Sequence, residues 1–129
     1  MITGLDHVQL AIPAGGEDAA RAFYGGVLSL REIAKPAALA GRGGVWFALA
    51  DGRQLHLGVE TPFVAAAKAH PALAADDVDA VAAALAAAGY EVAWDDGLAP
   101  RRRGYVGDPF GNRVEVIEGI EGGGADGAR

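Results

Sequence analysis

Any chemistry in this chain must rest on a small set of reactive side chains. The 129 residues include three histidines (His7, His56 and His70), no cysteine and a single serine, Ser29. The lack of cysteine excludes disulfides, thiolate metal ligands and cysteine nucleophiles. Because Ser29 is not flanked by the glycines of a nucleophile elbow, a serine hydrolase is also disfavoured. The sequence therefore directs attention to histidine, carboxylate, tyrosine and arginine side chains.

The histidines occupy matching places in an internal repeat. The stretch DHVQLA near the N-terminus aligns with AHPALA in the second half, which pairs His7 with His70. The stretch GRQLH likewise aligns with GNRVE, which pairs His56 with Glu115. A single histidine on a strand is more often packed or solvated than a ligand, but here all three fall on repeat-related positions. If the two halves pack around a pseudo-two-fold axis, these residues converge as nitrogen and oxygen donors for a divalent transition metal.

Each half is predicted to contain one strand, one helix and three further strands. The first helix opens after Gly16 and carries apolar residues at three- and four-residue spacing. The second is capped by Asp76-Asp77 and ends at Gly89, while Asp51-Gly52 predicts a hairpin turn. The predicted strands cover residues 5–12, 31–34, 44–50 and 53–60, then 70–75, 90–94, 103–107 and 112–118.

We expect one domain over residues 1–118, which is a typical size for a single core. Module one is predicted at 1–60, a connector at 61–69 and module two at 70–118. Residues 119–129, rich in glycine, are predicted to form a disordered tail.

Charge and hydropathy restrict the partners. A net charge of −6 and a pI near 4.9 argue against nucleic-acid binding, which needs a basic face. The longest apolar stretch, residues 80–88, is too short to span a membrane, and the N-terminus lacks the features of a signal peptide. We therefore expect a soluble cytoplasmic protein with a small-molecule substrate and no nucleic-acid or membrane partner.

Three stretches resemble the vicinal oxygen chelate superfamily, which includes glyoxalases, bleomycin-resistance proteins and extradiol dioxygenases. They are LDHVQLAI from Leu5, ARAFYGGVL from Ala20 and DPFGNRVEV from Asp108. The resemblance spans residues 4–118. It implies an α+β fold in which two βαβββ modules with pseudo-two-fold symmetry form an open, mostly antiparallel β-barrel cleft, and it implies a homodimer.

The resemblance also implies one divalent transition metal per site, whether nickel, cobalt, zinc, manganese or iron. Members with three ligands use the positions of His7, His70 and Glu115, and members with four add the position of His56. That fourth ligand is usually Glu or Gln, so a histidine here departs from the familiar pattern. His56 is interpreted as a fourth metal ligand, with a role as a neighbouring acid–base group left open.

The function implied is that of a glyoxalase-like lyase or isomerase. In such an enzyme the metal chelates vicinal oxygens of a small substrate and stabilises an enolate or alkoxide intermediate. Glu115 and His56 are the predicted catalytic residues, with Glu115 moving a proton. The alternatives are a ferrous extradiol-type dioxygenase, a non-catalytic drug-binding protein of the bleomycin-resistance kind, and a structural or regulatory module. Retention of all four donor positions favours an enzyme.

Strand alternation places further side chains beside the predicted ligands, because residues two apart share a face. One of Trp46 and Phe47 should line the cleft and the other should enter the core. Arg101, Arg103 and Tyr105 alternate on one face, either as a wall that recognises anions or as a charged strand edge. The predicted substrate-binding residues are Gln9, Gln54, Arg103, Tyr105 and Arg113.

Overall fold

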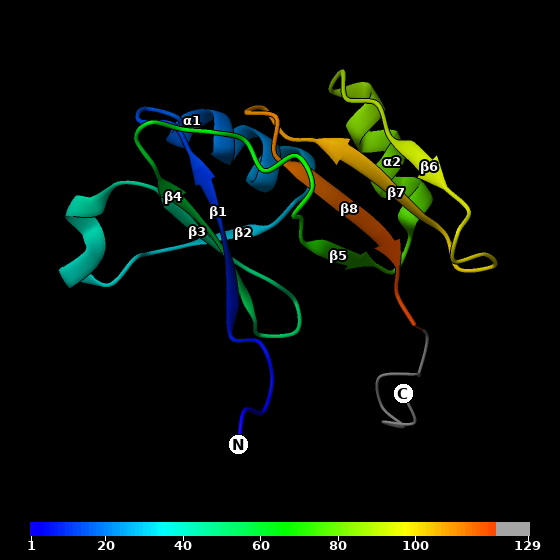
Figure 1. Ribbon diagram of the computed structural model, residues 1–129, viewed down its shortest axis with the longest axis horizontal. Coiled ribbons are helices and arrows are strands. Elements are labelled where there is room, and N and C mark those ends of the chain that lie inside the picture. Colours follow the sequence, from blue (N-terminus) through cyan, green and yellow to red (C-terminus); the bar gives the residue numbers. More distant parts are fainter. Residues whose placement is uncertain (121–129) are drawn as a thin grey trace.

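The computed structural model describes residues 1–120, which form two four-stranded sheets (Figure 1). Sheet A has the order β1-β4-β3-β2, and sheet B has the matching order β5-β8-β7-β6. Sheet A consists of β1 (His7–Ile12), β2 (Arg31–Ile33), β3 (Val45–Ala48) and β4 (Gln54–Val59). Sheet B consists of β5 (Ala72–Ala75), β6 (Ala93–Asp95), β7 (Arg103–Gly107) and β8 (Arg113–Glu118).

The same pairing pattern recurs in both sheets. The first strand of each module runs parallel to the last, and the remaining pairs are antiparallel. The predicted α+β fold of two βαβββ modules is therefore confirmed. The two sheets do not close into a continuous barrel, so β1 and β5 are left as open edges.

The helices α1 (Glu17–Ala20) and α2 (Val78–Ala87) lie on one side of the sheets (Figure 1). The first continues as a π-helical segment, η1 (Arg21–Val27), and a 3₁₀ segment, η2 (Ala37–Arg42), follows β2. In the second module α2 is capped as predicted. The Asp77 carboxylate accepts from Ala80 N at 3.0 Å, and Gly89 takes a left-handed φ of +91° just beyond the helix.

One continuous core joins the modules beneath these helices. Ile12, Phe23 and Phe47 from module one are fully or almost fully buried in the same cluster as Leu85 and Val114 from module two. Phe47 is thus the core member of the Trp46-Phe47 pair. None of the helices within residues 1–120 is long and apolar enough to cross a membrane.

Several predicted boundaries differ from the structure. Strand β6 begins only at Ala93, because the Tyr90 ring packs edge-on against Phe23 at 4.8 Å and fills the core instead. His70 lies before β5 rather than within it. Gly119, assigned to the tail, donates its N–H to Ala75 O at 2.8 Å and extends the sheet. The rest of the predicted tail, 121–129, lies outside the described residues.

Candidate metal and substrate site

The four predicted metal ligands lie on the sheet faces opposite the helices, as two separate pairs. His7 and His56 contact each other on sheet A, and His70 contacts Glu115 on sheet B. We call these surfaces the open faces. The open face of sheet A carries His7, Gln9, Trp46, Gln54 and His56, and that of sheet B carries His70, Arg103, Tyr105, Arg113 and Glu115.

Three rings stack on the open face of sheet A. The His56 ring lies between His7, with centroids 4.3 Å apart, and Trp46, with centroids 3.7 Å apart and planes tilted by only 2°. The strand register explains the stack, because β4 lies between β1 and β3 and Trp46 sits directly opposite His56. Trp46 therefore lies on the open face of sheet A, outside the core, and its stacking holds the His56 imidazole in place.

Short hydrogen bonds orient both imidazoles of this pair. His7 Nδ1 lies 2.9 Å from the Asp6 carboxylate, and His56 Nε2 lies 2.8 Å from Gln54 Oε1. Each acceptor fixes which ring nitrogen carries the proton. Burial, and next the neighbouring His7, lower the pKa of His56, which is only 4% exposed. Its imidazole is thereby held neutral, as a ligand must be.

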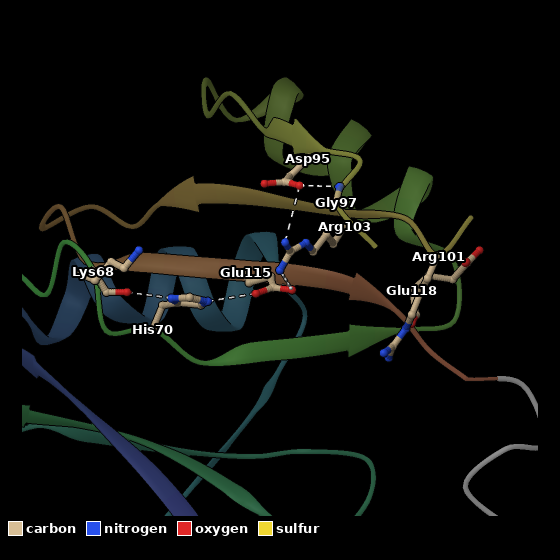
Figure 2. A network of polar contacts seen from close by, with 8 residues as sticks. All are labelled: Lys68, His70, Asp95, Gly97, Arg101, Arg103, Glu115 and Glu118. Atoms are coloured by element: carbon tan, nitrogen blue, oxygen red, sulfur yellow. Dashed lines mark hydrogen bonds and ion pairs between the residues drawn. The ribbon is translucent and has the colours of Figure 1, made fainter. Parts of the chain in front are cut away.

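A chain of polar contacts crosses the open face of sheet B (Figure 2). His70 Nδ1 donates to the Lys68 carbonyl at 2.8 Å, which directs Nε2 toward Glu115 Oε1 at 2.9 Å. The other Glu115 oxygen lies 3.5 Å from Arg103, which also lies 3.5 Å from Asp95. Glu115 is only 4% exposed, and His70 and Arg103 supply the partners of its two carboxylate oxygens.

The aromatic ring at the centre of this face contacts both arginines. Arg113 lies over the Tyr105 ring, with Cζ 3.7 Å from the centroid, and Arg103 lies 5.5 Å from the same ring. Strand β7 pairs with β6 and β8, so it is an interior strand and the charged-edge alternative is wrong. Arg101 instead donates to the Glu118 carbonyl at 2.8 Å, outside this cluster.

The remaining predicted residues take different places. Gln54 holds His56, whereas Gln9 lies against Gly58 and lines a small hollow of about 190 Å³ with Lys35, Arg42 and Trp46. Asp6 and the Lys68 carbonyl were not predicted as orienting groups. Asp6 precedes His7 directly, so adjacency was an available signal, but nothing in the sequence marks a backbone carbonyl as a partner.

The donor chemistry fits a divalent metal, but one copy of the chain does not assemble the full set. Within residues 1–120 no group of three or more His, Asp or Glu side chains is close enough to hold an ion. His7 and His70 instead both line a cleft of about 670 Å³ between β1 and β5. The remaining walls of the cleft are mainly apolar and include Leu5, Val8, Leu30, Leu49 and Leu73.

Comparison with known proteins identifies the family. The sequence model of the Glyoxalase/Bleomycin resistance protein/Dioxygenase superfamily matches residues 4–116. The chain belongs to this superfamily. A glyoxalase family protein from Bacillus anthracis is 44% identical, with a TM-score of 0.88 over 93% of this chain and 98% of the other. A search of curated protein sequences gives no significant match.

More distant proteins of known structure share the architecture. Lactoylglutathione lyase from Agrobacterium tumefaciens is 25% identical, with a TM-score of 0.71 over 92% of this chain and 96% of the other. The genomically encoded fosfomycin resistance protein from Listeria monocytogenes is 20% identical, with a TM-score of 0.72 over 93% and 96%. At 20% identity the likeness shows a shared fold only.

Proposed function

We propose that this protein is a metal-dependent, glyoxalase-like lyase or isomerase that acts on a small molecule. The observation that carries the proposal is the part-buried contact between His70 and Glu115, 2.9 Å apart on the open face of sheet B, with His70 already oriented by a backbone carbonyl. Orientation of a ligand imidazole by a second hydrogen bond is typical of protein metal sites. Membership of a superfamily that includes a lactoylglutathione lyase supports the same assignment.

The proposed metal site is completed by a second copy of the chain. His7 and His56 of one copy would provide two nitrogen donors, and His70 and Glu115 of the other would provide a nitrogen and an oxygen. Two features support a homodimer: β1 and β5 are open edges, and the cleft between them is mainly apolar. Nitrogen and oxygen donors without sulfur suit nickel, cobalt, zinc, manganese or ferrous iron.

The chain's own residues have distinct roles in the proposed reaction. When bound, the metal supplies Lewis acidity that stabilises negative charge on substrate oxygens. Glu115 accepts and returns the substrate proton, since its carboxylate lies on the open face of sheet B beside His70. Arg103, 3.5 Å from Glu115, holds that carboxylate in place, and Gln54 holds the His56 ring.

A dioxygenase is the second candidate, because one observation favours it. His56 is buried, held neutral and stacked between two rings, which are suitable conditions for an acid–base group beside a ferrous site. A purely ligand-binding protein is disfavoured, since it has no need for four repeat-related metal donors.

Metal analysis and two assays test the proposal. Purified protein should bind about one divalent ion per site and turn over a hemithioacetal, followed spectroscopically, without consuming oxygen. Glu115→Gln should lower the turnover number at least about 100-fold, the lower end of general acid–base contributions. The matched control is Glu118→Gln, at the end of the same strand. Oxygen uptake with a catechol panel would instead support the dioxygenase, and protein that takes up no metal would overturn both.

A further inference from the structure

The two arginines on the open face of sheet B differ in their partners. Arg103 lies 3.5 Å from both Asp95 and Glu115, so its charge is compensated. Arg113 lies on the neighbouring strand and takes part in none of the ion pairs formed within residues 1–120. Its backbone N–H donates to Ala66 O at 2.9 Å, which fixes the position of the residue.

The Tyr105 ring positions the Arg113 guanidinium without using its donors. A cation–π contact at 3.7 Å restrains the group but consumes none of its N–H bonds. The planar fork therefore remains available to an external acceptor, and its geometry matches a carboxylate. Nearby, Arg103 Nε is buried and has no hydrogen-bond acceptor within residues 1–120. This face thus has more donors than acceptors.

Charge balance favours an anionic ligand. Arg103 is paired with Asp95 and Glu115, whereas Arg113 forms none of the ion pairs within residues 1–120, so the Arg113 charge is available to an anion even without a metal. The whole chain carries a net charge of −6, so an available cation here is not a general property of its surface. Beside the half-buried Arg113, a negatively charged substrate gains more than a neutral one of the same shape.

We propose that the substrate carries a carboxylate and that Arg113 binds it. The part of the proposal that concerns the reacting atoms rests on the proposed metal-dependent function. Arg113 and Glu115 lie two residues apart on one face of β8, and the Arg113 guanidinium lies over the Tyr105 ring, which pairs with Glu115 across the strands. A carboxylate bound by Arg113 would therefore lie on the same face as Glu115. The substrate class is a small carboxylic acid.

A binding experiment tests this in the metal-free full-length protein. Pyruvate and glycolate are titrated against their neutral amides, pyruvamide and glycolamide, with chemical shifts as the readout. The acids should bind and the amides should not, and Arg113→Gln should weaken the binding of the acids by about tenfold or more. Arg113→Lys, which keeps the charge but not the fork, should recover part of that loss. Arg102→Gln, whose arginine pairs with Asp79 on α2, should bind the acids like the wild type.

Defined outcomes overturn the proposal. They are equal binding of acids and amides, unchanged binding of the acids by both Arg113 variants, or a clear preference for methylphosphonate over the carboxylates. Since these titrations contain no metal, a protein that fails to take up metal would refute the proposed function but leave the anion result readable. Conversely, full metal loading and turnover with no dependence on Arg113 would refute only the carboxylate assignment.

Discussion

His56 shows how much of a residue's role depends on its immediate contacts. Its position in the repeat matches Glu115, yet its surroundings are aromatic rather than charged. The ring is sandwiched between His7 and Trp46, and its Nε2 is engaged by Gln54. These contacts keep the imidazole neutral and oriented, which serves a metal ligand and an acid–base group equally. A direct measurement of metal affinity separates the two roles.

We predict that His56→Ala weakens metal binding more than about 100-fold, beyond the 10- to 100-fold range typical of residues that only support a ligand. Gln54→Ala is the matched control and should fall within that range, because Gln54 contacts His56 and not the proposed metal. Competition with a chelator of known affinity measures both. Full metal retention by His56→Ala, together with lost turnover, would assign His56 to acid–base chemistry.

Glu17 ties the start of α1 to the loop that precedes β3. Its carboxylate accepts from Gly44 N at 2.9 Å, and this backbone hydrogen bond is the main cause that lowers the pKa of Glu17 below its ordinary value of 4.5. Gly44 has a φ of +88°, and a side chain there would collide with the Leu57 carbonyl. Position 44 therefore requires glycine for the loop to keep this conformation.

Because folding lowers the pKa of Glu17, its ionised form stabilises the native state above pH 4.5, and that stability is lost as the pH falls through the folded pKa. Glu17→Gln should cost about 1 kcal/mol at pH 7. The difference from the wild type should shrink below pH 4.5. Urea denaturation at a series of pH values measures it, with Asp18→Asn, at an almost fully exposed side chain, as the control. A difference independent of pH would contradict the assignment.

Among the structural elements, the turn from Asp108 to Asn112 connects the modules. Asn112 is 1% exposed; its side chain donates to Ala11 O at 2.8 Å and accepts from Ala66 N at 2.9 Å. Tyr24 of η1 donates to the Asp108 carboxylate at 2.7 Å, and burial raises the pKa of Tyr24, so its hydroxyl stays protonated. The most recognisable motif of the sequence thus holds the fold together and places β8, with Glu115 and Arg113.

Asn112→Ala should lower the free energy of unfolding by about 2 kcal/mol, because it leaves the half-buried Ala11 carbonyl and Ala66 N–H without their side-chain partner. Arg102→Gln removes an exposed ion pair with Asp79 and a contact with the exposed Trp94 ring, and it should cost about 1 kcal/mol or less. Thermal or urea unfolding compares the two variants. If Asn112→Ala costs no more than Arg102→Gln, the side chain of Asn112 does not hold the two modules together.

Contacts within a strand or at the end of a helix could be predicted from the sequence. Strand alternation predicted that Gln54 lies beside His56, and the two side chains are in contact, since side-chain direction along a strand is set locally. The Asp77 cap was equally predictable from its local pattern. The role of Trp46 as a stacking partner was not, because it depends on the register between β3 and β4. The separation of the donors into two pairs depends on how whole sheets pack, which no local pattern encodes.

At the scale of the whole molecule, residues 1–120 of one copy leave three features without a partner. The edges β1 and β5 are open, Leu5 beside them is 68% exposed, and each open face holds only half of the proposed donor set. A two-fold dimer would provide a partner for all three features, because an isologous contact brings module one of each copy against module two of the other. It would create two equivalent sites, each with His7 and His56 from one chain and His70 and Glu115 from its partner.

Mixed dimers test this arrangement, and the expected result follows from the geometry alone. His7→Ala and Glu115→Gln homodimers should both be inactive, because each carries a defect in every site. In a mixed dimer of these variants, one shared site collects both defects and the other collects none. Differently tagged copies, co-expressed and purified through both tags, should therefore recover about half of the wild-type activity per dimer. A mixed dimer of His7→Ala with His56→Ala is the matched control and should remain inactive, since both defects lie in module one and each site receives one. If the first mixture also stays inactive while its dimers form and fold, every site is built within a single copy, and the two halves of the donor set must then meet by a rearrangement of sheets A and B.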